Sequence, residues 1–361
     1  MDFTFSDDQE ALRESVRAFL SDRGMSYVRA MVDDERGFTD EVWSAMSELG
    51  WPGLLVPESD GGLGLGLVDM VVVLEEMGRF PFTGPYFSSS VFATIAAKRL
   101  GESDLLKQLA SGELRGTVAL EEFGHGDVVD RVRTRSRRKG ADWVVNGLKP
   151  TVLDGNTADW AIVVARTEDG IGSFLLEAPK ATLVPGLDPT RKIARLELDD
   201  RVVRPIGPDG DHSALWARIV DDTAVMLAAE LVGSCEQAHQ LAVEYAKVRV
   251  QFDRPLASFQ AIRHKAVDML QQVELARVGT HYAAWTSDAE DPARERAAAM
   301  CKGFVGEAAV FVSGEDIQIH GGVGFTWDCD AHFHFKRAKA SDVMLGGSGV
   351  HRGRLADLVL G

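Results

Sequence analysis

Two long segments with helical periodicity are joined by a short turn, and this joint constrains the fold more than any other feature of the sequence. The turn lies at Asp253-Arg254-Pro255, where proline cannot continue a helix. Apolar residues recur at helical spacing on both sides of it. Before the turn they are Val220, Ala224, Leu227 and Leu231, and after it Phe259, Ile262, Ala266 and Met269. The sequence therefore predicts two helices that meet at a corner.

Three side chains at this corner have the chemistry of a nucleotide-binding site. The guanidinium of Arg249 can hold a phosphate through two parallel hydrogen bonds, and the amide of Gln251 can both donate and accept. Phe252 is flat enough to lie against an aromatic ring. A structural interpretation is also open, in which Arg249 pairs with a carboxylate, Gln251 is solvated and Phe252 fills the core. Short motifs match by chance, so the corner alone does not decide between them.

The rest of the chain divides by its periodicity into three parts. Capped helices are predicted to begin near Asp8 and at Thr39, and further helix follows between 68 and 101. From about Gly116 the pattern changes to short β-rich runs separated by turns. The runs are 118–120, 132–136, 143–145, 160–165, 173–176 and 196–198. We expect a helical domain at 1–115, a β domain at 116–208 and a helical bundle at 209–361, which is an α+β fold.

Charge and apolar patterning exclude several classes of partner. The 361 residues carry a formal net charge of -16, which argues against nucleic acid and against an anionic membrane surface. No uncharged apolar run approaches the roughly 20 residues of a spanning helix, and the N-terminal residues lack a signal-peptide pattern. Cys235, Cys301 and Cys329 have neither disulfide-scaffold nor zinc spacing, so we expect reduced thiols in a cytoplasmic protein.

Two further patterns suggest a ligand-binding site, but each lacks residues that such a site needs. The glycine-rich loop at 61–66 has no preceding strand and no Lys-Ser/Thr pair, so it is not a phosphate-binding loop. His332 and His334 form a His-x-His pair without a carboxylate or third histidine at helical spacing. We therefore predict no metal site.

The order of motifs around the corner resembles the C-terminal domain of the flavin-dependent acyl-CoA dehydrogenases. Arg-x-Gln-Phe is followed by Pro, Phe-Gln-Ala-Ile, His and Asp-Met, and Gln-Ile-His-Gly-Gly-Val-Gly-Phe comes later at 318–325. The resemblance implies an N-terminal helical domain, a β-barrel or sandwich, and a C-terminal four-helix bundle. It also implies that this chain binds the pyrophosphate and adenine end of a neighbouring subunit's FAD. The residues that it assigns to this contact are Arg249, Gln251, Phe252, Gln318, Gly321 and Gly322.

The resemblance fails where the family holds the flavin ring. One signature, close to Thr-Glu-Pro-x-x-Gly-Ser-Asp, is here Glu121-Glu122-Phe123-Gly124-His125-Gly126-Asp127-Val128, without the hydroxyls. The other, close to Trp-Ile-Thr-Asn-Gly, is here Thr151-Val152-Leu153-Asp154-Gly155. The acidic groups of the first stretch would also lie badly beside a reduced flavin anion. We expect that this chain does not hold the ring in the standard way.

The catalytic base is missing as well. The family's usual position, a Glu before Gly-Thr, is occupied here by Leu345. The alternative position falls near Thr223, beside Asp222. Glu230 is a lone carboxylate in an apolar helix, which is more often a structural group than a base.

These departures make the chain similar to the partner subunit of heteromeric actinobacterial acyl-CoA dehydrogenases that oxidise steroid side-chain CoA thioesters. We expect a two-plus-two hetero-oligomer with a sister subunit that supplies the base, an acyl-CoA substrate and an electron-transfer acceptor protein. One alternative is a self-sufficient homo-oligomeric enzyme with Glu230 or Asp222 as base. Another is a non-catalytic scaffold of the same fold. Arg249 separates these hypotheses, because only a flavin-binding chain needs it for cofactor affinity.

Overall fold

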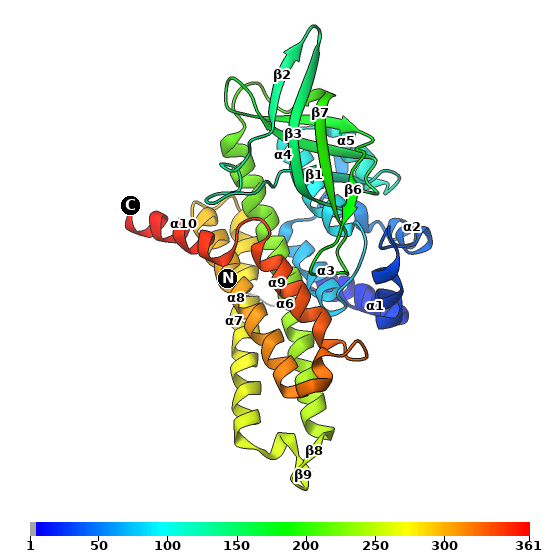
Figure 1. The fold of residues 1–361 in the computed structure, drawn as a ribbon, viewed down its shortest axis with the longest axis vertical. Coiled ribbons are helices and arrows are strands. Elements are labelled where there is room, and N and C mark those ends of the chain that lie inside the picture. Colours follow the sequence, from blue (N-terminus) through cyan, green and yellow to red (C-terminus); the bar gives the residue numbers. More distant parts are fainter. Residues whose placement is uncertain (1–4) are drawn as a thin grey trace. The chain divides into compact units, whose positions relative to one another are not determined.

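The computed structural model describes residues 5–361 (Figure 1). Helix α1 (Asp7–Asp33) begins at a reciprocal cap, as predicted. The Ser6 hydroxyl accepts from the amide of Gln9 at 3.2 Å, and the Gln9 side chain accepts from the amide of Ser6 at 3.1 Å. Thr39 caps α2 (Asp40–Glu48) by accepting from the amide of Val42, also as predicted.

The chain forms two compact units from discontinuous stretches. The helical unit contains Met1–Arg29, Leu67–Phe82 and Ala224–Gly361, and the mixed unit contains Ala30–Gly66 and Thr83–Thr223. Along the sequence the order is helices, β sheet and helices, which is the acyl-CoA dehydrogenase-like α+β arrangement expected. The domain boundaries that the sequence predicts, at 115/116 and 208/209, stay a prediction.

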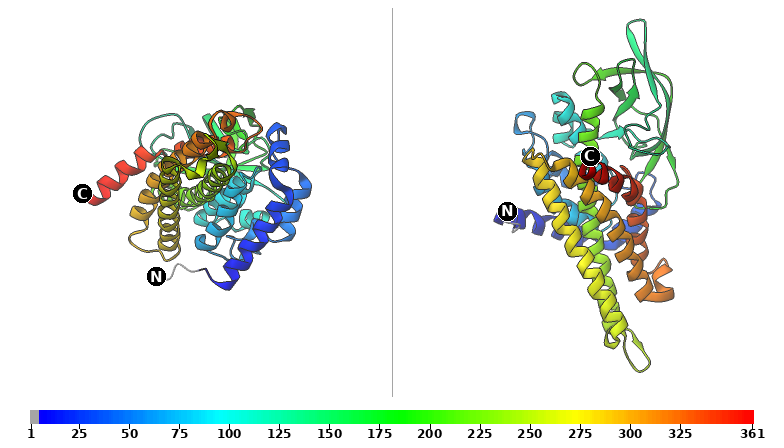
Figure 2. Two further views of the ribbon diagram at one scale, coloured as in Figure 1. Left: turned by 90° about the horizontal axis from the view of Figure 1, so that it is seen from below. Right: turned by 90° about the vertical axis from the view of Figure 1, so that its left-hand side faces the viewer.

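Long helices dominate the helical unit. After α1 they are α3 (Leu67–Arg79), α6 (Ser213–Val248, in this unit from Ala224), α7 (Gln260–Asp288), α8 (Arg294–His320), α9 (Ala331–Val343) and α10 (Ser348–Leu360). Helix α8 packs against α7, α9 and α10 (Figure 2). An apolar window of α8 is hydrophobic enough to cross a membrane, but 67% of it is buried in the structure. Its apolar composition therefore suits a central helix of the unit.

Two glycines allow α3 and α6 to cross in close contact. A Cβ at Gly78 would lie 1.9 Å from the carbonyl oxygen of Glu230, and one at Gly233 would lie 1.8 Å from that of Glu75. Each helix therefore presents a glycine to the backbone of the other. This crossing fixes the middle of α6, and with it the register of the turns that lead to the corner.

Short helices and a β barrel make up the mixed unit. The helices are α2, η1 (Trp51–Gly53), η2 (Glu58–Asp60), η3 (Tyr86–Ala93, a π-helix), α4 (Thr94–Leu100), α5 (Ser103–Ala110) and the start of α6. The strands are β1 (Gly116–Ala119), β2 (Arg135–Lys139), β3 (Asp142–Leu153), β4 (Trp160–Arg166), β5 (Ile171–Glu177), β6 (Thr182–Val184) and β7 (Ile193–Ile206).

The sheet closes on itself because β5 pairs with both β4 and β7. The ring runs β4-β2-β3-β7-β5, with β1 added beside β4 and β6 beside β7. Its interior is filled by alternate side chains of these strands, including Val145, Val163, Phe174 and Leu196. Of the expected β-barrel or sandwich, the structure therefore has the barrel. Of the predicted runs, 132–134 is not strand, whereas β3 and β7 are much longer than expected and β6 was not predicted.

Candidate functional site

The predicted corner is a tight hairpin at the end of α6. The helical pattern continues to Arg249, whose amide donates to the carbonyl of Tyr245 at 2.8 Å. Two-residue strands follow, β8 (Val250–Gln251) and β9 (Arg254–Pro255), and they pair antiparallel. The amide of Leu256 then donates back to the Arg249 carbonyl at 2.8 Å and closes the loop. The hairpin caps the long α6–α7 pair at the end labelled β8 and β9 in Figure 1.

Both residues at the tip of this hairpin are left-handed. Phe252 has φ 53° and Asp253 has φ 61°. Asp253 stands where the family usually has glycine, and an acidic side chain tolerates left-handed backbone angles better than most. The conformation of Phe252 was not foreseen. It is a strained choice for an aromatic residue, and the tip holds its ring out of the unit.

The corner side chains face solvent and leave most of their binding capacity unused. The guanidinium of Arg249 is exposed and makes no hydrogen bond or ion pair with residues 5–361. The amide nitrogen of Gln251 donates to the carbonyl of Val250 at 2.8 Å. Phe252 is 87% exposed and forms an edge-to-face ring pair with Phe259, with centroids 6.2 Å apart. The structural interpretation with Phe252 in the core is therefore wrong.

The second predicted motif lies at the end of α8. Gln318 is exposed on the last helical turn. A Cβ at Gly321 (φ 65°) or at Gly322 would meet nothing within 4 Å, so the backbone there borders open space that another molecule can approach closely. Gly324 differs, because a Cβ there would lie 2.9 Å from the carbonyl oxygen of Ile317. Gly324 is thus needed for packing, whereas the other two glycines are available for contact.

A ring stack brings the two motifs together. Tyr245, one turn before Arg249 on α6, stacks on His320 at the end of α8, with centroids 4.3 Å apart and planes at 27°. His320 directly precedes the two open glycines. The helical unit therefore gathers Arg249, Gln318 and the glycine turn around one contact between α6 and α8.

Glu230, the first alternative base, is held in a buried ion pair. It is 4% exposed and bonded to the guanidinium of Arg337, which is itself 1% exposed. The same guanidinium donates to the carbonyl oxygen of Phe82 at 3.0 Å. A carboxylate in this environment is tied to a fixed cation and is not available to take a proton from a substrate carbon. The contact argues for the structural role of Glu230.

Asp222, the second alternative base, is engaged in the same way. Its carboxylate accepts from Arg99 at 2.9 Å and from Arg218 at 3.1 Å, and the residue is 3% exposed. The two arginines occupy the oxygens of this carboxylate. The structure therefore binds both alternative carboxylates to buried or partly buried arginines.

The family's usual base position is occupied by an apolar residue, in a loop that hydrogen bonds hold in place. Leu345 is 2% exposed, with φ 55°, and its carbonyl accepts from Nε2 of His351 at 2.9 Å. Beside it, the fully buried Lys302 donates to the carbonyls of Ser341, Asp342 and Gly346 at 3.2, 2.7 and 3.2 Å. The loop is thus built around backbone oxygens and offers no carboxylate at 345.

In the mixed unit, the stretch 121–128, which differs from the family's first ring-binding signature, forms an internal ion pair. Glu122 turns inward and accepts from Nζ of Lys149 at 2.7 Å and from the amide of Arg133 at 2.8 Å. Lys149 has no exposed side-chain surface and also donates to the carbonyl of Leu120 at 3.0 Å. Burial lowers the pKa of Lys149 to about 8, although Glu122 opposes the shift. The next residue, Phe123, is 74% exposed.

The stretch 151–155, which differs from the second ring-binding signature, also makes internal contacts. Leu153 is buried, and its carbonyl accepts from the hydroxyl of Thr117 at 2.6 Å. Asp154 is 4% exposed and accepts from the hydroxyl of Ser88 at 2.6 Å. Thr151 points outward as an exposed residue. Both stretches therefore use their polar groups to stabilise the mixed unit rather than to present donors.

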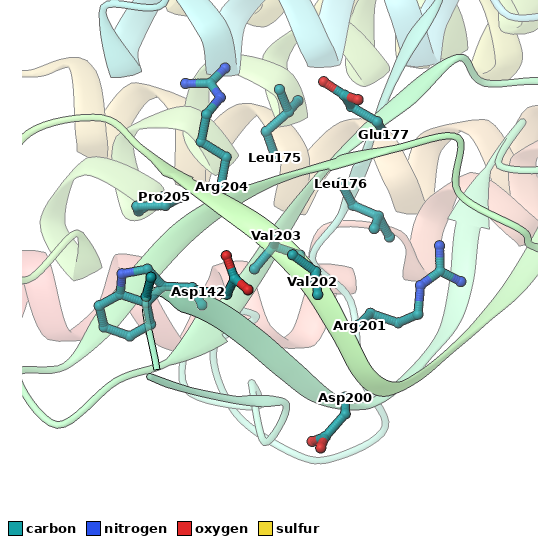
Figure 3. A pocket seen from close by; sticks show the side chains of 12 residues that line it. Asp142, Leu175, Leu176, Glu177, Asp200, Arg201, Val202, Val203, Arg204 and Pro205 are labelled. Atoms are coloured by element: carbon teal, nitrogen blue, oxygen red, sulfur yellow. The ribbon is translucent and has the colours of Figure 1, made fainter. Parts of the chain in front are cut away.

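A hollow of about 720 Å³ opens in the barrel where β5 and β7 separate (Figure 3). The pairing of these strands stops at Leu175 and Arg204, and Leu176 and Val203 line the gap beyond. Charged groups of both signs surround it: Asp142, Glu177, Asp200, Arg201 and Arg204. Since none of the predicted cofactor-binding residues lines this hollow, it is separate from the candidate site.

Comparison with known proteins places the chain in a family. Residues 6–113 match the sequence model of the acyl-CoA dehydrogenase N-terminal domain, and residues 213–360 match that of the C-terminal domain. Acyl-CoA dehydrogenase IpdE2 of Mycobacterium tuberculosis is 33% identical over 343 residues, which cover 94% of this chain and 93% of that protein.

Solved structures agree with the sequence matches. The ChsE4-ChsE5 complex from Mycobacterium tuberculosis contains a chain with a TM-score of 0.90 and 29% identity, covering 100% of this chain and 99% of that one. A variant of the Tcur3481-Tcur3483 steroid ACAD has a TM-score of 0.88 and 30% identity, with 98% of each chain covered. The chain therefore belongs to the acyl-CoA dehydrogenase family.

Proposed function

We propose that this chain is a subunit of an FAD-dependent acyl-CoA dehydrogenase that acts in the α,β-dehydrogenation of a CoA thioester. In this proposal the chain contributes the pyrophosphate and adenosine side of an FAD site, and a sister subunit contributes the ring side and the base. Two solved relatives support the heteromeric arrangement, because each is a complex of two different chains by name. The steroid substrate class follows by analogy with the Tcur3481-Tcur3483 enzyme.

The observation that carries the proposal is the contrast within this one chain. The helical unit fits the phosphate end of the cofactor, because Arg249 has an uncommitted guanidinium and the backbone at Gly321 and Gly322 is open. The loops that align with the ring-binding signatures do not fit, because Glu122 and Lys149 fill one of them with a buried ion pair. Bound FAD would supply the hydride acceptor for the reaction. This chain's residues would position its phosphates.

Flavin content tests the proposal directly. The chain should be purified alone and after co-expression with the product of an adjacent acyl-CoA dehydrogenase gene, and its visible absorbance compared with protein concentration. We expect no flavin in the isolated chain and about one FAD per pair of subunits in the complex. A full complement of flavin in the isolated chain would overturn the shared-site proposal and favour the self-sufficient alternative.

A matched pair of variants separates the enzyme from a scaffold. Arg249→Ala in the complex should lower FAD retention, whereas Arg296→Ala should not. Arg296 is also exposed, and it lies near the start of α8, whereas Gln318 lies near its end. Equal flavin content in the two variants and the parent would support the non-catalytic scaffold instead.

A further inference from the structure

A buried carboxylate lies next to the glycine turn of the candidate site. Asp316, on α8, has no solvent exposure, and one of its oxygens lies 2.9 Å from Nδ1 of His320. The same ring nitrogen lies 3.0 Å from the backbone oxygen of Asp316. His320 thus directs Nδ1 into the unit, toward two oxygens of one residue. Such a contact fixes Nδ1 as the protonated, donating nitrogen.

The geometry of the imidazole then determines where its other nitrogen lies. Nε2 is on the opposite side of the ring from Nδ1, so it faces away from Asp316. The stack on Tyr245 fixes the plane of the ring, with centroids 4.3 Å apart. Tyr245 and Arg249 are four residues apart, so they lie on the same side of α6, about 6 Å apart along the axis. The His320 ring is therefore held beside the face of α6 that ends in Arg249.

The charge of this pair depends on pH in a defined direction. Burial acts to lower the pKa of His320, but the hydrogen bonds and charge of Asp316 outweigh it and raise the pKa above the ordinary 6.5. Burial raises the pKa of Asp316, and His320 opposes that shift. Tyr245 on α6 stacks on the ring, and Cys329, before α9, has its pKa raised by burial and also by the charge of Asp316. With Asp316 ionised, the pair is neutral while His320 is protonated and carries one negative charge once His320 loses its proton.

We propose that His320 is a further FAD-binding residue, which donates from Nε2 to a phosphate oxygen of the cofactor that Arg249 holds, and that Asp316 is its positioning residue. The inference rests on the proposed function, because it concerns the same shared site. A buried carboxylate this close to an anion site would repel a diphosphate on its own. Paired with His320, whose side chain is 8% exposed, it instead holds a positively charged ring next to the open backbone of Gly321 and Gly322.

The test is the pH dependence of FAD affinity in the hetero-oligomeric complex. FAD can be removed and titrated back between pH 6 and pH 9, with the dissociation constant read from flavin fluorescence. In the parent we expect affinity to fall as pH rises through the pKa of His320. His320→Gln should bind FAD about tenfold more weakly near pH 6 and should lose that part of the pH dependence. His320→Arg should keep the affinity but show no titration, because arginine stays charged.

Asp316→Asn distinguishes a positioning role from a merely structural one. Without the carboxylate the pKa of His320 falls, so the midpoint of the affinity profile should move to lower pH. An unchanged affinity and profile in folded His320→Gln, with weak binding in Arg249→Ala, would overturn the role of His320 and leave the proposed function standing. If Arg249→Ala also binds FAD like the parent, the proposed function itself fails, and the inference fails with it.

Discussion

The helix corner and the loop at Glu122 are both places where a member of this family is expected to meet FAD, and they are built in opposite ways. At the corner, Arg249 is exposed and uncommitted, and Phe252 is 87% exposed. In the mixed unit, Glu122 and Lys149 bond to each other, and Lys149 has no exposed surface. One region leaves its arginine without a partner among the described residues, and the other pairs its charges with each other.

The difference teaches that a stretch without the hydroxyls of the family signature can use its charges for internal structure. A loop that merely lost its hydroxyls would leave an open, polar surface. Here the loop has become part of the barrel, because Glu122 accepts from a barrel lysine and from the amides of Arg133 and Thr134. Restoring a serine or threonine in this stretch would therefore not restore a site, because the inward ion pair would remain.

The largest expected effect comes from breaking that ion pair. Glu122→Gln leaves Lys149 buried without its carboxylate, which should lower the free energy of unfolding by about 3 kcal/mol. In Glu122→Gln the pKa of Lys149 will lie below its value of about 8 in the parent protein. The deficit should therefore be greatest near pH 6 and should shrink as pH rises through 8, where Lys149 is neutral in both proteins. Urea unfolding at pH 6 and pH 9 measures this.

The control for this variant is Asp200→Asn, which breaks exposed ion pairs to Arg137 and Lys139. Exposed pairs of this kind contribute less than about 1 kcal/mol. A deficit in Glu122→Gln no larger than that in Asp200→Asn would mean that the closed loop is not held by its ion pair, and the comparison with the corner would lose its basis.

Leu345→Glu tests whether a base can simply be reinstalled. A carboxylate at this buried position should destabilise the chain by about 3 kcal/mol, through lost packing and burial of a charge. The isolated variant should gain no dehydrogenase activity, because the ring-side loops are closed. Thermal unfolding and a dye-reduction assay with an acyl-CoA give the two readings. Activity in the isolated variant would show that the chain holds a flavin ring by itself.

Arg249→Ala sharpens the other side of the comparison. Removing a charged, two-pronged phosphate contact should weaken FAD binding in the complex by about 2 kcal/mol, or roughly thirtyfold. Chain stability should not change, because the guanidinium has no partner among the described residues. Equilibrium dialysis of FAD and urea unfolding can be compared on the same preparation. A loss of stability without a loss of affinity would indicate a structural arginine instead.

The smallest effect is expected at the hairpin tip. Asp253→Gly removes the cost of a left-handed acidic residue but adds chain entropy to the unfolded state, so we expect a net stabilisation of about 0.5 kcal/mol. Asp253→Ala should be no more stable than the parent, because alanine is poorly suited to φ 61°. Differential scanning calorimetry resolves the order. Greater stability of the alanine variant would contradict the strained-turn interpretation.

Local signals in the sequence predicted the elements that depend on neighbours in the chain. The Thr39 cap and the turn at 253–255 could both be predicted, because capping and turn chemistry act over a few residues. The exposed corner was predicted from residue types at 249–252 and from their resemblance to a family motif. The comparisons confirm the family, whereas the cofactor roles of these residues stay predictions.

Features that depend on residues far away in the sequence could not be predicted from it. The length of β7 depends on its pairing with β3, and β6 forms only by pairing with β7. In the sequence Glu230 is a lone carboxylate among apolar residues, and its partner Arg337 lies 107 positions away. Lys149 falls in a stretch where nothing local indicates burial. Such contacts follow from tertiary packing, which short-range periodicity does not predict.

The exposed tip has a consequence for the behaviour of the isolated chain in solution. Val248, Val250 and Phe252 are 76%, 51% and 87% exposed within a few residues of one another. A chain that is not covered at this hairpin displays the apolar cluster to solvent, and contiguous exposed apolar residues of this kind favour association. A preparation of the chain alone is therefore expected to self-associate through the hairpin as its concentration rises.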